Sequence, residues 1–566
     1  MSSPTQRPRL LCYGAMIAAG ALLALSPRDQ SGDSMEYAAK AILGEAIFHP
    51  HHLLHPTFLA FLTRLGDLLG FDRNLLDFFR LAQLGVAWIG LWAAYRFFRA
   101  LRFARPSATL GTVLIAVSGG VWQYAGQIEA YNPGTAAIAL SAWMVARAAR
   151  ITVRRGGAPG LAPWAVASAA IAFATFFHQI AALLSPALAL LAFIELRGRA
   201  GITRRQSWLL PVGMLVVAGA ISLGGHFLAY LIDRSPGMPF TVWITSYAHW
   251  SNTNWGLPEH LGVGGLGVLL RSWFGMWFNV DPFEYYHPAP GYTLKAAAAL
   301  ALAFGAAWVF VAVRALRTGE RRWRHAAWIA LWMIATESFL LWWTPFQRSM
   351  QNLSILPQVT LLLLAASALG QMLRARGVPA RRLRAAGIAT GAAAALLLVA
   401  VGAKSLAIPG LARRTEPEGE LLLLKPLMAP EDLVMTSWPL TRTIPALMNH
   451  RRVTEPFPPL DDPDAHLPDW RSATPGAGRN PRVIVHRRAI AIDPVLAHRA
   501  ERNAAEHFDR LLTTLEERAG GTGRLRANLV AGPEGILAVV YGIDPDLPLT
   551  AAQARAALEG LRPTGY

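Results

Sequence analysis

The chain has 566 residues, of which 53% are hydrophobic and 16% are charged, and its formal net charge is +18. A soluble domain usually carries about 25% charged residues, so this composition favours a membrane protein. Of the 53 Lys and Arg, 24 lie in six short clusters beside apolar segments, a pattern that argues against nucleic-acid binding. The excess charge is better explained by membrane topology and contact with anionic lipid headgroups. The single cysteine, Cys12, excludes an internal disulfide and a Cys-based metal site.

Apolar segments recur along the chain as far as residue 403. A hydrocarbon core of about 30 Å requires about 20 apolar residues per helix. We therefore predict eleven membrane-spanning helices, near 10–25, 75–98, 107–124, 130–149, 161–177, 179–196, 208–231, 292–314, 326–343, 353–373 and 386–403. The first is interpreted as an uncleaved helix, because no small-x-small cleavage site and soluble domain follow it.

Arginine clusters occupy every second gap between these spans. They lie at 7–9, 96–105, 147–155, 197–205, 314–324 and 374–384. Because cytoplasmic loops carry the excess of Lys and Arg, this alternation predicts a cytoplasmic amino end and an external carboxyl end. Segment 53–70 is apolar but carries Arg64 and Asp67, and counting it as a span would place the later clusters outside. We interpret it as an amphipathic helix at the outer interface.

The predicted topology leaves large outer segments at 26–74 and 232–291. The second is rich in aromatic residues, which suit either a membrane-interface belt or a groove for sugar rings or lipid. From residue 405 the composition changes: β-like runs at 432–436, 482–485 and 536–541 alternate with a helical stretch near 496–518. The predicted fold is therefore a mainly α, polytopic membrane domain (1–404) followed by a small α/β or α+β extracytoplasmic soluble domain (405–566).

Four polar clusters interrupt or flank the spans, all on the predicted outer side: 32–37, 127–132, 178–179 and 344–352. Ionisable groups at membrane depth are costly, so their gathering at one face is a functional-site hypothesis. Each has a structural alternative. Asp33 is also a suitable helix N-cap, and Glu129 a solvated helix-end charge. His178 is equally a hydrogen-bonded core histidine, and Arg348 a headgroup anchor.

These clusters resemble motifs of the GT-C class of integral-membrane glycosyltransferases, in particular the group with a GDSGE signature that includes protein O-mannosyltransferase-like proteins. The matching segments are Gly32-Asp33-Ser34-Met35-Glu36-Tyr37 with His49-Pro50, Gln127-Ile128-Glu129-Ala130-Tyr131, His178 with Leu183, Leu184 and Pro186, and Trp343-Thr344-Pro345-Phe346-Gln347-Arg348. The resemblance extends over 10–370. It departs from the signature at Met35 (Gly in the group), at 51–54 (Pro-Gly-Tyr-Pro) and at Gln347 (Glu).

The resemblance implies a GT-C-like fold and transfer of a sugar from a polyprenyl-phosphate donor to an acceptor hydroxyl on the extracytoplasmic face, with inversion. A carboxylate can take the proton of the attacking hydroxyl, and Asp33, supported by Glu36, is the candidate base. Arg348 is the candidate partner of the donor phosphate. The remaining candidate substrate-binding residues are Gln127, Glu129, Tyr131, His178 and Gln347.

His49, His51, His52 and His55 form a dense cluster in the first outer segment that could bind a divalent metal together with Asp33 or Glu36. His49 and His51 are the candidate ligands put forward. The alternative is that the His-Pro pairs mark turns beside the membrane surface.

Other classes of function compete with the transferase. A transporter, or a flippase or polymerase of lipid-linked glycans, would also have many spans and buried charges, although no internal repeat is visible. A non-catalytic membrane scaffold is a further alternative. The expected partners are the lipid bilayer, the polyprenyl-phosphate sugar and an acceptor glycan, lipid or protein, without nucleic acid. The abundance of Ala and Arg points to a bacterial plasma (inner) membrane. The sequence leaves the sugar, the acceptor, metal dependence and oligomeric state open.

Overall fold

A computed structural model of the chain describes residues 7–26, 32–44, 48–71, 75–157, 160–233, 238–250, 262–278, 291–343, 348–403, 424–429, 431–436, 453–454, 467–468, 470, 480–486, 504–521, 523–532 and 535–559. They fall into two compact units. The first lies within Met1–Gln30, Ala46–Leu59 and Phe79–Arg413, and the second within Ser31–Glu45, Ala60–Phe78 and Arg414–Tyr566.

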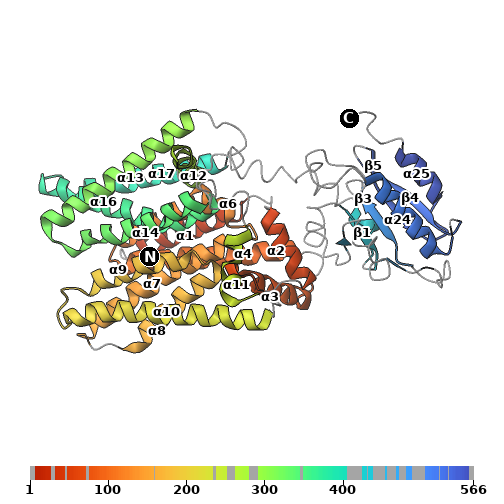
Figure 1. Ribbon diagram of the computed structural model, residues 1–566. Helices are drawn as coiled ribbons and strands as arrows, with labels where there is room; N and C mark the ends of the chain where they lie inside the picture. The colour runs from red at the N-terminus through yellow and green to blue at the C-terminus, as the bar shows by residue number, and fades with distance from the viewer. Residues whose placement is uncertain are drawn as a thin grey trace. The chain divides into compact units, whose positions relative to one another are not determined.

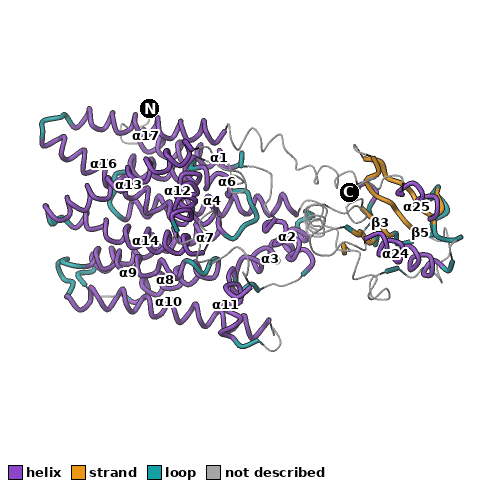
Figure 2. Tube along the Cα trace, turned by 45° about the horizontal axis from the view of Figure 1, so that its top comes forward, coloured by secondary structure: helices purple, strands orange, loops and turns teal. Residues whose placement is uncertain are grey.

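Up to Gly402 the described chain is built of helices (Figures 1 and 2). They are α1 (Arg7–Leu23), α2 (Gly32–Leu43), η1 (Pro50–His52), α3 (Leu54–Leu68), α4 (Leu75–Ala100), α5 (Arg105–Ala116), α6 (Gly119–Tyr124), α7 (Tyr131–Arg154), α8 (Leu161–Phe177), α9 (Ala181–Leu196), α10 (Arg204–Asp233), α11 (Phe240–Trp250), α12 (Val263–Phe278), α13 (Gly291–Thr318), α14 (Arg321–Trp343), α15 (Arg348–Gln351), η4 (Asn352–Ser354), α16 (Ile355–Ala375) and α17 (Ala380–Gly402).

Seven of the described helices are long and apolar enough to cross a membrane: α4, α7, α10, α13, α14, α16 with η4, and α17. Three of the predicted spans form shorter apolar helices, α1, α8 and α9. The prediction of a polytopic, mainly helical membrane protein is therefore confirmed. Small residues allow the helices to approach closely. At Gly90 of α4, for example, a Cβ atom would lie 3.0 Å from the Cα of Ala136 in α7.

The predicted span at 107–124 is helical but divided between α5 and α6. Val117 ends α5, and Ser118 adopts an extended backbone while its hydroxyl donates to the carbonyl of Ile115. Gly120, in the first turn of α6, faces Asn352 so closely that a Cβ atom would lie 2.3 Å from its Oδ1. The break therefore brings α6 against the start of η4. The periodicity of apolar residues alone did not predict it.

The segment at 53–70, interpreted as an amphipathic helix, forms α3. Leu59 and Leu62 are buried on one of its faces, whereas Phe61 and Leu68 are exposed. The helix and its two unequal faces agree with the prediction. Its location at the membrane interface stays a prediction.

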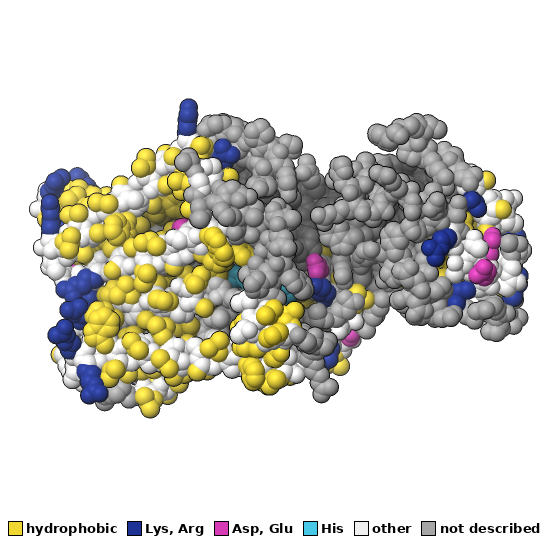
Figure 3. Space-filling view, viewed as in Figure 1, with side chains coloured by type: hydrophobic (Ala, Val, Ile, Leu, Met, Phe, Trp, Pro, Cys, Tyr) yellow, Lys and Arg dark blue, Asp and Glu magenta, His cyan; other side chains and the backbone are white. Residues whose placement is uncertain are grey.

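The arginine clusters at 96–105, 147–155, 197–205 and 314–324 meet at one end of the first unit, as their contacts show. Arg150 donates to the carbonyl of Arg99, and Arg314 donates to Gln371. Arg199 and Arg321 both pair with Glu195, at 3.6 and 4.0 Å. On the face drawn in Figure 3, Lys and Arg gather at the left-hand end of the apolar helices. The alternation of basic clusters along the sequence thus becomes a basic end of the bundle.

The second unit contains a mixed sheet in its carboxyl-terminal part (Figure 1). Its described strands are β1 (Leu433–Met435), β2 (Val453–Thr454), β3 (Val483–His486), β4 (Arg526–Gly532), β5 (Gly535–Gly542) and β6 (Leu549–Thr550). The strand order is β2-β1-β3-β5-β4-β6, with β1 parallel to β2 and β3 and the other pairs antiparallel. Helices α24 (Ala504–Ala519) and α25 (Ala551–Glu559) complete it, which confirms the predicted α/β or α+β domain.

Alternate residues of the strands face opposite sides of this sheet, as the two-residue period of a β-strand requires. Met435, Val485 and Tyr541 pack in a core with helix α24, whereas Val434 and Val540 pack in a second core on the other face. Because both faces are covered, the strands read as nearly continuous apolar runs in the sequence. This explains why they were visible as short β-like segments.

Candidate functional site

Two segments far apart in the sequence are tied together at the end of the bundle where α8 and α9 meet. His52 Nδ1 lies 3.2 Å from the carbonyl oxygen of Phe177, and His51 Nδ1 lies 3.3 Å from Oε1 of Gln179. Gln179 also donates through Nε2 to the carbonyl of Pro50 at 2.7 Å. Since carbonyl and amide oxygens accept, both histidines donate through Nδ1. The short helix η1 is thereby fixed against the α8–α9 hairpin.

Three imidazole rings meet at this junction. The ring centroids of His51, His52 and His178 lie 4.6 Å (His51–His52), 4.9 Å (His51–His178) and 4.6 Å (His52–His178) apart. The exposed fractions of their side chains are 8%, 5% and 0%. Burial lowers the pKa of His51 to about 4, and burial together with the neighbouring imidazoles holds the pKa of His52 well below its usual range. The rings are therefore neutral at physiological pH.

The segment that joins α6 to α7 forms a second wall beside these rings. The ring of Tyr131 lies 5.4 Å from that of His178. Glu129 is 3% exposed, and its carbonyl accepts from the side chain of Gln83. Gln127 is 6% exposed, and its Oε1 atom has no hydrogen-bond partner in the described part of the chain. Three predicted substrate-binding residues are therefore buried in one short segment beside His178.

His55, at the start of α3, links the histidine segment to the same wall. Its Nε2 atom donates to the carbonyl of Ile128 at 3.3 Å, and its side chain is fully buried. Burial lowers the pKa of His55 to about 4, although the hydrogen bond to Ile128 acts in the opposite direction. His55 therefore positions the predicted substrate-binding segment as a neutral donor.

The end of α14 and the start of α16 supply a third wall. The ring of Trp343 lies 6.4 Å from that of His51. Gln351 donates to Oε2 of Glu337 at 3.0 Å, and the buried Oδ1 atom of Asn352 accepts no hydrogen bond from a described residue. A carboxylate, two amides and an indole thus lie at this corner. Glu337 was not among the predicted residues, although a lone acidic residue in the apolar segment 326–343 was a signal that pointed to it.

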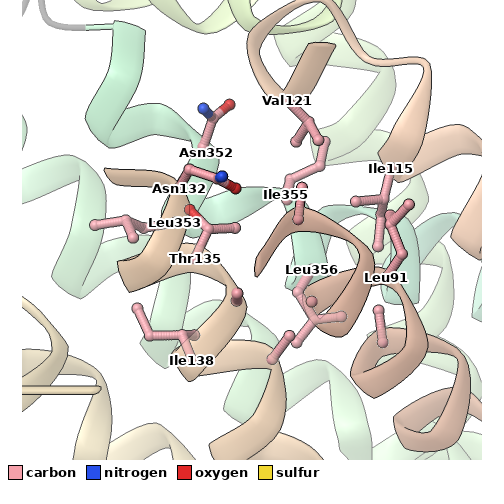
Figure 4. A pocket seen from close by; sticks show the side chains of 15 residues that line it. Leu91, Ile115, Val121, Asn132, Thr135, Ile138, Asn352, Leu353, Ile355 and Leu356 are labelled. Carbon is pink, nitrogen blue, oxygen red and sulfur yellow. The ribbon is translucent and has the colours of Figure 1, made fainter. Parts of the chain in front are cut away.

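A small cavity lies between α4, α5, α6, α7, η4 and α16 (Figure 4). Its volume is about 30 Å³, which is room for about two water molecules. Asn132 and Asn352 lie near one end, whereas Leu91, Ile138 and Leu356 form apolar walls (Figure 4). Asn132 itself donates to the carbonyl of Gln83 at 2.8 Å. The cavity is therefore polar at the end that Asn132 and Asn352 form and apolar along the rest of its lining.

Of the four remaining predicted residues, the structure describes Glu36 fully, the backbone alone of Asp33 and Arg348, and nothing of Gln347. Asp33 and Glu36 belong to α2 in the second unit, where Glu36 pairs with Lys40 at 2.5 Å. The side chain of Asp33 lies outside the described residues, although its backbone is helical. Gln347 lies outside them as well, and Arg348 begins α15 with an undescribed side chain. Of the metal candidates, His51 is in the ring cluster, and the ring of His49 lies 5.7 Å from that of His52.

Two residues that organise this site were not among the predicted substrate-binding residues. His52 was considered only as one of four clustered histidines that could bind a metal, and Gln179 only as the neighbour of His178. An adjacent histidine pair and a polar residue inside an apolar hairpin were the available signals.

Together, these observations define a polytopic membrane protein in which buried polar groups from η1, the α6–α7 connection, the α8–α9 hairpin and the α14–α16 corner meet at one end of the helical unit. The arginine clusters meet at a different set of loops.

Solved structures with similar chains identify the fold further. No family model and no curated protein sequence matches this chain. A structure of ArnT from Cupriavidus metallidurans bound to undecaprenyl phosphate is similar over 95% of this chain and 98% of its own, with 14% identity and a TM-score of 0.55. Its apo structure matches over the same shares with 15% identity and a TM-score of 0.49.

The oligosaccharyltransferase of Archaeoglobus fulgidus, in complex with zinc and sulfate, matches 94% of this chain and 74% of its own, with 13% identity and a TM-score of 0.46. Of these three structures, the undecaprenyl phosphate complex of ArnT alone exceeds a TM-score of 0.5. ArnT is a GT-C protein, so the resemblance inferred from four short motifs is confirmed for the fold.

Proposed function

We propose that this protein is a membrane glycosyltransferase that transfers a sugar from a polyprenyl-phosphate donor to an acceptor hydroxyl. The observation that carries the proposal is the convergence of buried polar groups at one end of a membrane bundle. The fold of this bundle is similar to that of ArnT. The solved ArnT complex contains undecaprenyl phosphate, which supports a lipid carrier of the same chemical class as the donor here.

The reaction is a displacement at the anomeric carbon of the donor. The acceptor oxygen forms a bond to that carbon, the bond from the carbon to the phosphate oxygen breaks, and polyprenyl phosphate leaves as an anion. The hydroxyl proton passes to a carboxylate, for which Asp33, with Glu36 one helical turn away, is our candidate. Because the leaving group is already a stable anion, its departure needs positive charge rather than a general acid, and we assign that role to Arg348.

The buried polar residues of the α6–α7 connection would orient the sugar. Glu129 and Gln127 offer acceptors for sugar hydroxyls, and Tyr131 beside His178 offers an aromatic face to a pyranose or furanose ring. We place Gln347 in the same substrate-binding role. Because the arginine clusters mark the cytoplasmic end, we assign the reaction and the domain 405–566 to the extracytoplasmic face of a bacterial plasma membrane.

The test uses the full chain in nanodiscs with a panel of polyprenyl-phosphate hexoses and pentoses, together with glycan, lipid and peptide acceptors. Release of polyprenyl phosphate is measured for the wild type, for Asp33→Asn and for Asp546→Asn, which changes an exposed carboxylate of the soluble domain. We expect one donor class to be consumed, a loss of about 10²- to 10⁴-fold in Asp33→Asn, and no change in Asp546→Asn.

One result would overturn the proposed activity, and another would overturn the assignment of the base. The first is that no donor is consumed while a lipid-linked sugar moves across proteoliposomes, which would indicate a transporter. The second is equal turnover in Asp33→Asn, which would keep the enzyme class and remove the assigned base.

A further inference from the structure

Three histidines from two separate segments bring their ring nitrogens together inside the bundle. In the described part of the chain, His51, His52 and His178 each offer one nitrogen such that these atoms all lie within 4.8 Å of one another. All three side chains are buried. In a tetrahedral zinc site the bonds from metal to nitrogen are about 2.0–2.1 Å, so the nitrogens stand about 3.3 Å apart. Side-chain movements of about 1 Å would convert the observed cluster into that geometry.

The hydrogen bonds of two of the rings set the tautomer that a metal requires. His52 donates from Nδ1 to the carbonyl of Phe177, and His51 donates from Nδ1 to Oε1 of Gln179. A neutral imidazole that donates from Nδ1 carries its lone pair on Nε2. Histidines that bind metals commonly have such an oriented second nitrogen, with a carbonyl or amide oxygen as the acceptor. The two rings are therefore held in the form that offers Nε2 to an ion.

His178 supplies an independent observation. Its side chain is fully buried, and its Nε2 atom has no hydrogen-bond partner among the residues that the structure describes. A buried polar atom without a partner costs about 1–3 kcal/mol, so its persistence beside two imidazoles calls for an explanation. Its Nδ1 accepts from the amide of Ile180 at 3.3 Å. Coordination through Nε2 would shift the ring proton to Nδ1 and forfeit this bond, which is long for a hydrogen bond between nitrogen atoms and therefore weak.

We propose that His51, His52 and His178 bind one divalent transition-metal ion, with Zn²⁺ as the ion of choice. Three imidazoles without thiolates suit zinc better than magnesium or calcium, which prefer oxygen ligands. Three protein ligands leave a fourth position for water or an anionic oxygen. The ion would join η1 to the α8–α9 hairpin. This inference stands independently of sugar transfer, because it rests on the ligands alone.

The experiment measures zinc bound to the full chain in detergent, purified without a histidine tag and stripped with a chelator. Equilibrium dialysis against Zn²⁺ alone is followed by elemental analysis of the protein. We expect one equivalent of zinc at low micromolar free Zn²⁺. If the wild type binds none at about a hundredfold higher concentration, the proposal is wrong, whatever the variants do.

Matched variants separate ligation from folding. In His52→Asn the side-chain amide can still donate to Phe177 from the position of Nδ1, whereas the Nε2 ligand is gone. His325→Gln changes another buried histidine, which is hydrogen-bonded to Glu195 and lies outside the ligand set. We expect zinc affinity to fall at least 100-fold in the first and to be unchanged in the second.

Gln179→Ala removes the acceptor that orients His51, and we expect it to weaken zinc binding by about 10- to 100-fold. Thermal unfolding of the zinc-free proteins checks that each variant is folded. Equal zinc affinity in His52→Asn and the wild type would overturn the assignment of the ligands. Because no donor is present, failure of the transferase assay leaves this result unaffected.

Discussion

Acidification should loosen the contact between α3 and the α6–α7 segment through one titrating group, His55. Its side chain is fully buried and donates to the carbonyl of Ile128, and its pKa is lowered to about 4 from the ordinary value of 6.5. An opened segment exposes His55 to water and restores the ordinary pKa. Between pH 6.5 and 4 the opened form therefore binds more protons, so the closed form is fully stable above this window and loses stability as the pH falls through it.

The magnitude follows from the size of the shift. Each pKa unit corresponds to about 1.4 kcal/mol, and the part of the window between pH 7 and pH 5 amounts to about 2 kcal/mol. Local opening should therefore become about 30-fold more frequent at pH 5 than at pH 7 on account of His55 alone. The other buried histidines act in the same direction, so an absolute value for the wild type would not isolate this residue.

His55→Gln provides the comparison, because a glutamine amide can donate to Ile128 from the position of Nε2 but does not titrate. Hydrogen exchange of amides in 54–60 and 127–132, corrected for intrinsic rates, is measured on zinc-free protein at both pH values. We expect similar protection of the two proteins at pH 7. At pH 5 protection should fall about 30-fold further in the wild type than in His55→Gln. Identical pH dependence in both would refute the linkage to His55.

Two further predictions concern the soluble domain and the topology. Asp432 is fully buried and accepts hydrogen bonds from the backbone N–H and the guanidinium of Arg482. Asp432→Ala should therefore destabilise the sheet by about 3–5 kcal/mol, measured as lost hydrogen-exchange protection in β3. An effect below about 1 kcal/mol would contradict the role of this pair. The topology is tested with single cysteines in a Cys12→Ala background and a membrane-impermeant thiol reagent. Thr203→Cys at the basic end should react only from the cytoplasmic side, and Leu69→Cys only from the outside. Labelling of both from the same side would contradict the assigned topology.

The elements of the membrane unit could be predicted from the sequence because each depends on local composition. Arginine clusters and apolar windows located the spans, and short, nearly continuous apolar runs located β1, β3 and β5. The break between α5 and α6 could not be read in this way. It depends on the close approach of Gly120 to Asn352, which lies far along the chain. Local periodicity carries no information about such a contact.

The candidate site was predictable as a set of segments but not as a geometry. The buried carboxylate of Glu129 and the imidazole of His178 were visible as polar residues beside apolar runs. The hydrogen bond between His51 and Gln179 joins positions 128 residues apart and brings their neighbours, His52 and His178, together. Such a contact depends on tertiary packing and cannot be predicted from the local sequence. The orientation of His52 likewise depends on the carbonyl of Phe177, and that of His51 on the side-chain amide of Gln179. For this reason the sequence indicated metal candidates and the structure supplied a set of three nitrogens.

The most direct test of the account is to find where a polyprenyl-phosphate lipid binds. A photoreactive polyprenyl phosphate is activated in nanodiscs that contain the full chain, and the modified peptides are identified by mass spectrometry. A photoreactive phospholipid of similar length serves as the control. We predict adducts specific to the polyprenyl phosphate at 127–132, 178–179 and 343–352, which are competed by unlabelled polyprenyl phosphate. Adducts confined to the arginine-rich loops, or identical for the two lipids, would contradict a lipid-donor site at this end of the bundle.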